Sequence, residues 1–196
     1  MLQLSATRRN YVFNKTQEKV NEITDAKWED WERSFKSITQ HSQSTRSRAK
    51  LFRMYAGITY TNKAYHRFGH KDSPKCTYCQ EEKQDFAHLF LDCPGVKSFK
   101  EDLQREWQQD LTKKDWFFGT DCDDLSYLIR ESNIYLQVKN WKGKNLSKVQ
   151  LYIQICENER IEAAIAEKRN KLSEHIEKWQ GRFTLMQIQQ LPVPEK

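Results

Sequence analysis

Hydrophobic side chains recur along this chain with the period of an α-helix. In the first clear example they are spaced by three, four and three residues: Trp28, Trp31, Phe35 and Ile38. That spacing places them on one face of a helix. Asp25 is the expected N-cap, because its side chain can accept a hydrogen bond from a free N–H group of the first turn. Residues 1–20 are basic and only weakly periodic, so we expect a loose arm or a poorly anchored helix there.

Further helices are predicted beyond the polar stretch 39–47, which has the composition of a linker. The segment from Arg46 onward has an apolar face, and a short helix over residues 62–68 should end at Gly69, since glycine readily adopts the left-handed backbone of a helix end. The most sustained apolar stripe predicts a helix over residues 94–110 and consists of Val96, Phe99, Leu103, Trp107 and Leu111.

The last third of the chain is also periodic. We expect two helices near residues 123–131 and 133–141, and one long helix over residues 146–179. The apolar face of the long helix is expected to hold Ile161, Ile165, Leu172, Ile176 and Trp179. The ending LPVPEK has no periodicity and is expected to hang free.

The composition favours an all-α fold. Gly occurs only 6 times and Pro 4 times, which is little turn chemistry for a protein of many short strands. We therefore predict an irregular helical domain that is organised around one metal site and ends in a long C-terminal helix. The predicted divisions are an N-terminal arm and helix (1–43), basic helices with the metal-binding module (44–111), a C-terminal helical region (112–180) and a flexible tail (181–196).

Hydropathy argues against membrane and secreted classes of protein. No stretch approaches the roughly 18 apolar residues needed to cross a bilayer, and the start of the chain lacks the apolar segment of a secretory signal. We expect an intracellular protein, in the nucleus or the cytoplasm, with the nucleus slightly favoured. Thiols stay reduced there, so clustered cysteines favour metal binding over disulfides. Outside the cluster, Cys122 and Cys156 are expected to be small buried side chains.

The candidate metal ligands occupy one short stretch, KCTYCQEEKQDFAHLFLDCPGV, with the spacing C-x2-C-x8-H-x4-C. Two cysteines two residues apart can bind one ion from a single turn, and a later His and Cys can complete a tetrahedron. The alternative is that these cysteines and the histidine merely fill space in the core. The full spacing favours the metal site, whose ligands would be Cys76, Cys79, His88 and Cys93.

The local chemistry supports that assignment. Pro94 can begin a helix, which makes Cys93 its N-cap and exposes the sulfur to the positive end of the helix dipole. Three thiolates and one imidazole suit a single Zn²⁺ ion, and four protein ligands leave no position for a catalytic water, so the expected role is structural.

These residues resemble a known family. The segment RMYAGITYTNKAYHRFGHKDSPKCTYCQEEKQDFAHLFLDCPGVKSF is similar to the zinc-binding region that follows the polymerase domain in reverse transcriptases of LINE-type (non-LTR) retrotransposons. The stretches IYLQVKNWKGK and IEAAIAEKRNKLSEHIEKW resemble the far C-terminal helices of that family more loosely. The resemblance covers residues 45–180, and it matches the four candidate ligands to the family's metal ligands.

The resemblance implies a C-terminal module that holds template RNA or target DNA for the polymerase. The polymerase itself is missing, because no [FY]-x-D-D catalytic motif occurs in the sequence. We therefore expect an excised fragment or a small protein descended from one. The nearest string, TDCDD, is read as an acidic helix start at Asp121 to Asp124.

A basic block in residues 41–75 indicates the binding surface. It carries eight Lys and Arg and one Asp, a net charge of +7 within a chain whose total is +6. Such a block suits a polyanion, and the tyrosines interspersed in it can stack on unpaired bases. The candidate nucleic-acid-binding residues are Arg46, Arg48, Lys50, Arg53, Lys63, His66, Arg67, Lys71 and Lys75.

Two functions remain open from the sequence. The first is a zinc-stabilised module that binds RNA, single-stranded DNA or target DNA. The second is a structural adaptor that joins other protein subunits of a nucleoprotein complex through the Trp28 helix and the charged C-terminal helix. An enzyme is not expected, since no nucleophile with a base and no phosphate-binding loop stands out.

Overall fold

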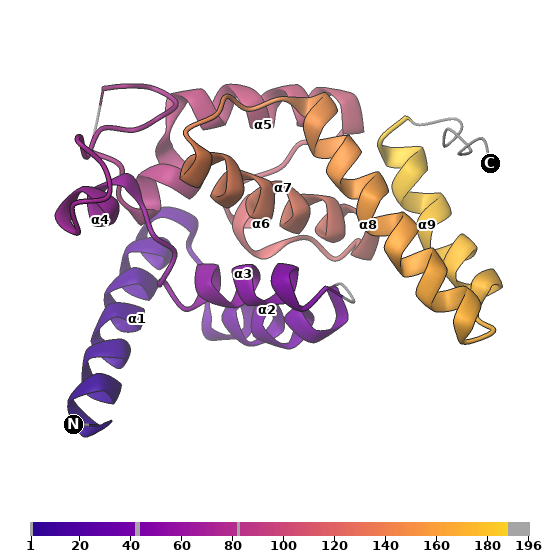
Figure 1. Cartoon of the computed structure of the whole chain (residues 1–196), viewed down its shortest axis with the longest axis horizontal. Helices are drawn as coiled ribbons and strands as arrows, with labels where there is room; N and C mark the ends of the chain where they lie inside the picture. The colour runs from indigo at the N-terminus through magenta and orange to yellow at the C-terminus, as the bar shows by residue number, and fades with distance from the viewer. Residues whose placement is uncertain (1, 42–43, 82, 188–196) are drawn as a thin grey trace.

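The computed structural model describes residues 2–41, 44–81 and 83–187, with side chains from residue 13 onward (Figure 1). Over these ranges the chain is helical and forms no strand, which confirms the predicted all-α class; a lone β-bridge pairs Lys75 with Lys83. None of the described helices is long and apolar enough to cross a membrane. The elements are α1 (Leu2–Thr24), α2 (Trp28–His41), α3 (Thr45–Tyr55), α4 (Asn62–Arg67), the π-helical turn η1 (His88–Asp92), α5 (Pro94–Trp107), α6 (Lys113–Phe118), α7 (Asp123–Lys142), α8 (Lys148–Lys168) and α9 (Leu172–Leu185).

Helix α7 lies at the centre of the fold and contacts α3, α6, α8 and α9 (Figure 1). Residues 125–129 and 131–136 are all buried, so the helix has almost no solvent-facing side over this length. A helix buried all round serves as a core element rather than a surface one. Its acidic first turn, Asp123 and Asp124, agrees with the predicted acidic helix start.

The prediction of two separate helices near 123–131 and 133–141 is wrong, because α7 is continuous. The polar pair at its middle does not interrupt it, since both side chains find partners. Ser132 Oγ donates to the carbonyl of Leu128 at 2.8 Å, and Asn133 Nδ2 donates to the carbonyl of Trp116 at 2.8 Å. Satisfied side chains no longer compete with the helical backbone.

Two hydrophobic clusters meet at α7. One cluster joins the metal-site cysteines to α5, α7, α8 and α9, and it includes the whole predicted stripe of residues 94–110: Val96, Phe99, Leu103, Trp107 and Leu111. The other joins α1, α2, α3, η1 and α6, with Trp31 packed edge-on against Phe117 and Phe118. Since α7 contributes to both clusters, the two halves of the protein share one core element.

The N-terminal helices differ from expectation in two respects. The second half of α1 is anchored, because Val20 is fully buried and Phe13 packs on Trp31. Asp25 is not the N-cap of α2; its φ of 52° places it in the left-handed turn that follows α1. The start of α2 is capped instead by Asp30, whose carboxylate accepts from the N–H of Lys27 at 2.9 Å.

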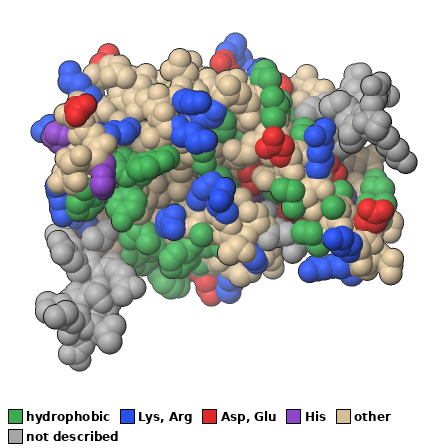
Figure 2. Space-filling view, viewed as in Figure 1, with side chains coloured by type: hydrophobic (Ala, Val, Ile, Leu, Met, Phe, Trp, Pro, Cys, Tyr) green, Lys and Arg blue, Asp and Glu red, His purple; other side chains and the backbone are tan. Residues whose placement is uncertain are grey.

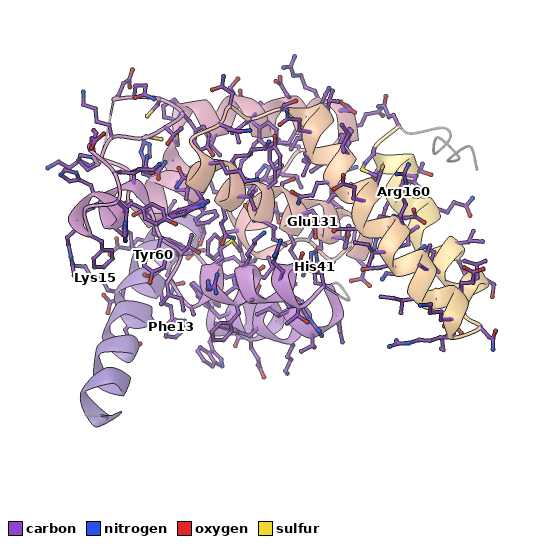
Figure 3. All side chains as sticks on the ribbon, in the orientation of Figure 1. Phe13, Lys15, His41, Tyr60, Glu131 and Arg160 are labelled. Carbon is purple, nitrogen blue, oxygen red and sulfur yellow. The ribbon has the colours of Figure 1, made fainter. Side chains whose placement is uncertain are left out.

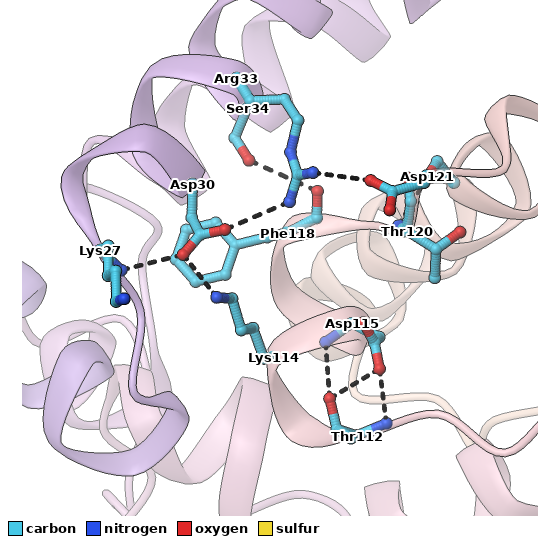
Figure 4. A network of polar contacts seen from close by, with 11 residues as sticks. Lys27, Asp30, Arg33, Ser34, Thr112, Lys114, Asp115, Phe118, Thr120 and Asp121 are labelled. Carbon is cyan, nitrogen blue, oxygen red and sulfur yellow. Dashed lines mark hydrogen bonds and ion pairs between the residues drawn. The ribbon is translucent and has the colours of Figure 1, made fainter.

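Asp30 also ties α2 to α6 (Figure 4). Its carboxylate forms salt bridges with Lys114 at 2.7 Å and with Arg33 at 3.2 Å. Arg33 forms a second salt bridge with Asp121 at 3.0 Å. Burial acts to raise the pKa of Asp30, but the hydrogen bonds from Lys114 and the Lys27 backbone outweigh it and the pKa is lowered. This contact fixes the angle between α2 and α6.

The C-terminal region is a helical hairpin and not the single long helix predicted over 146–179. The chain reverses at Asn170, whose φ of 54° is left-handed, and α9 packs back onto α8. The predicted apolar face is divided by this reversal: Trp179 is buried, whereas Ile161 and Ile176 are exposed. Polar contacts close the hairpin, since His175 Nε2 lies 2.9 Å from Glu159.

The predictions for the two cysteines outside the cluster and for the C-terminal tail also need correction. Cys122 is exposed and Cys156 half-buried, so neither fills a core position as predicted. The free tail predicted from residue 181 does not begin there, because α9 continues to Leu185 and Met186 is buried. The ending LPVPEK lies outside the described residues. Of the linker predicted over 39–47, residues 39–41 belong to α2 and 45–47 to α3, and residues 42–43 are outside the described ranges.

A buried polar network joins α2, α7 and α8 (Figure 3). The carboxyl group of Glu131 is fully buried and receives hydrogen bonds from His41 Nε2 at 2.8 Å, Gln154 Nε2 at 3.2 Å and Asn158 Nδ2 at 3.0 Å. Burial lowers the pKa of His41, so the imidazole is neutral and donates one N–H to Glu131. All the oxygens of this carboxyl group are therefore satisfied from neighbouring helices.

We predict that Glu131→Ala lowers the free energy of unfolding by roughly 3 kcal/mol, because three buried donors lose their acceptor. Urea denaturation followed by circular dichroism measures the change. The matched control is Glu157→Ala on the exposed side of α8, for which we expect a change within about 0.5 kcal/mol. Equal effects of the two substitutions would contradict the structural role of the network.

Candidate metal centre

The four predicted ligands come together at one point. The sulfurs of Cys76, Cys79 and Cys93 and a ring nitrogen of His88 all lie within 4.8 Å of one another. Cys76 Sγ is 3.5 Å from Cys93 Sγ, and Cys79 Sγ is 3.4 Å from His88 Nε2. In a tetrahedral zinc site the ligand atoms are roughly 3.5–3.8 Å apart, given Zn–S and Zn–N bonds near 2.3 and 2.0 Å. The cluster can hold a metal ion.

The first two ligands project from a tight turn. The N–H of Tyr78 points at Cys76 Sγ at 3.4 Å, and the N–H of Gln80 closes the turn on the carbonyl of Cys76. Gly95 in α5 presses directly on this turn, because a Cβ there would lie 2.8 Å from the carbonyl oxygen of Tyr78. A side chain at residue 95 would therefore push α5 away from the first pair of ligands.

The positions of the second pair, His88 and Cys93, are fixed by the end of one helical turn and the start of the next helix. Asp85 accepts from the N–H of His88 at 3.0 Å and begins the helical turn that carries the imidazole. The turn widens into the π-helix η1 and ends at Cys93, whose N–H bonds to the carbonyl of His88 at 2.8 Å. Cys93 is the N-cap of α5 and Pro94 is its first residue, as the sequence predicts.

A buried lysine completes this junction, and the sequence pattern did not predict it. The carbonyl of Phe90 would bond to the N–H four residues on, but that residue is Pro94 and has none. Lys100 Nζ donates to this carbonyl at 2.6 Å and lies 5.0 Å from the ring centroid of Trp116. Burial lowers the pKa of Lys100 to about 7. The sequence does offer one signal for this role, because Lys100 is a basic residue on the apolar face of the predicted helix 94–110.

The electrostatics of the sulfurs suit metal binding. A hydrogen bond from the Cys93 thiol lowers the pKa of Cys76 to about 4, helped by N–H groups of the turn and by the Gln84 amide. The same shared proton raises the pKa of Cys93. One thiolate is thus already stabilised, and a cation that displaces the shared proton can bind both sulfurs.

A groove lies between α3, α4 and the end of α7. Its volume is about 1240 Å³. Figure 2 shows hydrophobic side chains gathered on the left of this face next to Lys and Arg, in the area of Tyr60 (Figure 3). The side chains that line it include four cations, a histidine and four aromatic residues, and no acid is among the described lining residues: Arg46, Lys50, Arg53, Lys142, His70, Tyr60, Tyr65, Phe68 and Trp141.

The aromatic rings of the groove form a connected row. Tyr65 contacts Trp141 at 4.8 Å and Tyr60 at 5.6 Å, and Tyr60 meets Phe68 at 6.2 Å between ring centroids. More than half of the surface of Tyr60, Phe68 and Trp141 is exposed. The end of α7 contributes Trp141 and Lys142 to the groove.

The predicted nucleic-acid-binding residues are divided by the structure. Three of them, Arg46, Lys50 and Arg53, line the groove on one face of α3. Lys71 is instead held by Asn62 and the Asn140 carbonyl, and His66 bonds to the backbone of Lys71. The remaining predicted residues lie outside the groove lining: Arg48 half-buried, and Lys63, Arg67 and Lys75 exposed.

Comparison with known proteins finds no match among protein-family models, curated proteins or solved structures. A function for this chain therefore has to be inferred from its own sequence and from the geometry of its described residues.

We predict that the purified protein carries one equivalent of metal and that Cys93→Ala loses it. Structural zinc sites contribute roughly 10 kcal/mol or more to folding, so a chelator should lower the helical circular dichroism signal and the Tm of the wild type. Cys122→Ala is the matched control, since this cysteine is exposed and distant from the cluster in sequence. Equal metal content in the two variants would exclude the site.

Proposed function

We propose that this protein is a zinc-stabilised module that binds single-stranded nucleic acid, RNA or DNA. The observation that supports this most directly is the groove, where cations and exposed aromatic rings line one surface without an acid among the described residues. Proteins that bind single strands combine a cationic channel for the backbone with rings on which bases stack. Both components face the same space here.

Zinc is the metal that the donor set favours. Three thiolates with one imidazole form the Cys₃His set of structural zinc sites, and soft sulfur ligands discriminate against Mg²⁺ and Ca²⁺. Cys76, Cys79, His88 and Cys93 would hold the ion from four directions and leave no open position. The ion would supply rigidity and no chemistry, which agrees with our proposal that the isolated chain is not an enzyme.

The groove provides two kinds of contact with a strand. Arg46, Lys50 and Arg53 recur at intervals of four and three on α3 and lie in a row, so they can neutralise successive phosphates. Across from them, Trp141 and Tyr60 present rings to unpaired bases. None of the four groove cations forms a salt bridge with a described residue.

The resemblance to the zinc-binding region of LINE-type reverse transcriptases supports the same proposal from the sequence. It would make the chain a C-terminal module of such a polymerase or a relative of one, acting inside the cell and with the nucleus favoured. The structural adaptor is the second candidate. It is favoured by the outer side of α8, where apolar side chains are exposed: Val149, Ile153 and Ile161.

Removal of the three cations on α3 is predicted to lower both the affinity for a single-stranded oligonucleotide and the salt dependence of that affinity. Each phosphate contact with a single strand contributes about 0.7 to the slope of log K against log salt. A variant with Arg46, Lys50 and Arg53 changed to Ala should therefore lose about 2 from that slope. Fluorescence anisotropy of a labelled oligouridine, at several salt concentrations, measures it.

The matched control removes three exposed cations outside the groove, from α2 and α5: Lys36, Lys97 and Arg105. We expect the control to retain the wild-type slope. If both triple variants lose the same amount, binding depends on total charge and not on this groove.

A second prediction concerns the rings. Trp141→Ala should lower the affinity for an oligonucleotide by about 1–3 kcal/mol without changing the salt slope, because stacking involves no counterion release. Trp28→Ala is the control, since this tryptophan is also exposed but lies on α2. A weakened salt slope with unchanged low-salt affinity in Trp141→Ala would contradict stacking.

A further inference from the structure

A chain of buried amides connects the metal centre to the groove. Gln84 is fully buried, and both ends of its side chain are used. Nε2 donates to Cys76 Sγ at 3.3 Å, and Oε1 accepts from the N–H of Asn62 at 3.0 Å, at the first residue of α4. One amide therefore bridges a metal ligand and the helix that bears Tyr65.

The Gln84 backbone reinforces the bridge. Its N–H donates to the carbonyl of Pro74, and its carbonyl accepts from the N–H of Lys63 at 3.1 Å. Gln84 thus holds the stretch of chain before the first cysteine and the start of α4 at the same time. A shift of Cys76 would be transmitted to α4 through both the side chain and the main chain.

The connection continues from α4 to the opposite wall of the groove. Asn62 Nδ2 donates to the Lys75 carbonyl at 2.7 Å and to Thr77 Oγ1 at 2.9 Å, beside the first metal ligand. Lys71 Nζ donates to Asn62 Oδ1 at 2.6 Å and to the carbonyl of Asn140 at 3.2 Å. Asn140 directly precedes Trp141.

We infer that Gln84, Asn62 and Lys71 couple metal binding to the shape of the groove, so that the metal and a single-stranded nucleic acid each strengthen the binding of the other. This inference rests on the proposed function. The three act as positioning residues: they set the distance between the rings on α4 and Trp141. Coupling between two sites is reciprocal and typically amounts to 5–150-fold in affinity.

The test measures the affinity for Zn²⁺ by competition with a chromophoric chelator, with and without saturating oligouridine. We expect the oligonucleotide to tighten zinc binding by about tenfold in the wild type. Gln84→Leu keeps the side-chain volume but removes the bridge. In this variant zinc should still bind, but more weakly. The ratio of the zinc affinity with oligouridine to that without it should fall to about one. Gln109→Leu, at an exposed glutamine outside the metal-binding segment, should retain the wild-type ratio.

Lys71→Met tests the far end of the connection, away from the ligands. It should leave zinc affinity without oligonucleotide unchanged and reduce the ratio toward one. A readout without nucleic acid is hydrogen exchange of the α4 amides, which zinc should slow in the wild type and in Gln109→Leu but much less in Gln84→Leu.

The outcomes separate this inference from the proposed function. If oligouridine binds the wild type but leaves zinc affinity unchanged, or if the ratio persists in Gln84→Leu and Lys71→Met, the coupling is absent and the proposed function stands. If oligouridine does not bind the wild type at all, the proposed function fails and the inference fails with it.

Discussion

The structure depends on the meeting of Cys76, Cys79, His88 and Cys93 at one point. These ligands come from three segments: a tight turn, a single π-helical turn and the residue before α5. A cation bound there would stabilise their convergence, because its binding free energy is available only when all four ligands meet. Two neighbouring residues help to bring the ligands together. Gly95 lets α5 approach the turn, and Lys100 satisfies the carbonyl that Pro94 leaves without a donor.

The same junction supports both hydrophobic clusters. Cys76 and Cys93 belong to the cluster around α5, while Leu89, Phe90 and Leu91 of the intervening turn belong to the cluster around α2 and α3. Since α7 also contributes to both clusters, a change at this junction should affect the packing of both halves of the protein. A helix such as α7, buried on nearly every side and crossed by the Glu131 network, is stable only when all of its neighbours are in place.

The sequence predicts the ligand set and the all-α class well because both follow from local spacing. C-x2-C and the Cys93–Pro94 boundary are governed by a few residues, as is the stripe from Val96 to Leu111. The failures concern long-range partners. The continuity of α7 depends on the backbone carbonyl of Trp116, which accepts a hydrogen bond from Asn133. The reversal at Asn170 depends on the contact between His175 of α9 and Glu159 of α8. The bridge made by Gln84 joins residues more than twenty positions apart, so no periodic pattern reveals it.

The groove gathers positive charge beside exposed rings, which suits the proposed anionic ligand. Burial lowers the pKa of Lys50, and so do the nearby Arg46, Lys142 and Arg53, while Glu131 acts in the opposite direction. Elsewhere on the surface the described cations commonly meet an acid, as Lys36 meets Glu32 and Lys97 meets Glu101. Cations gathered in one groove repel one another, and a polyanion would reduce that repulsion. A phosphate backbone laid along α3 would remove that repulsion, and its bases would cover the aromatic surface that α4 and α7 leave open to water.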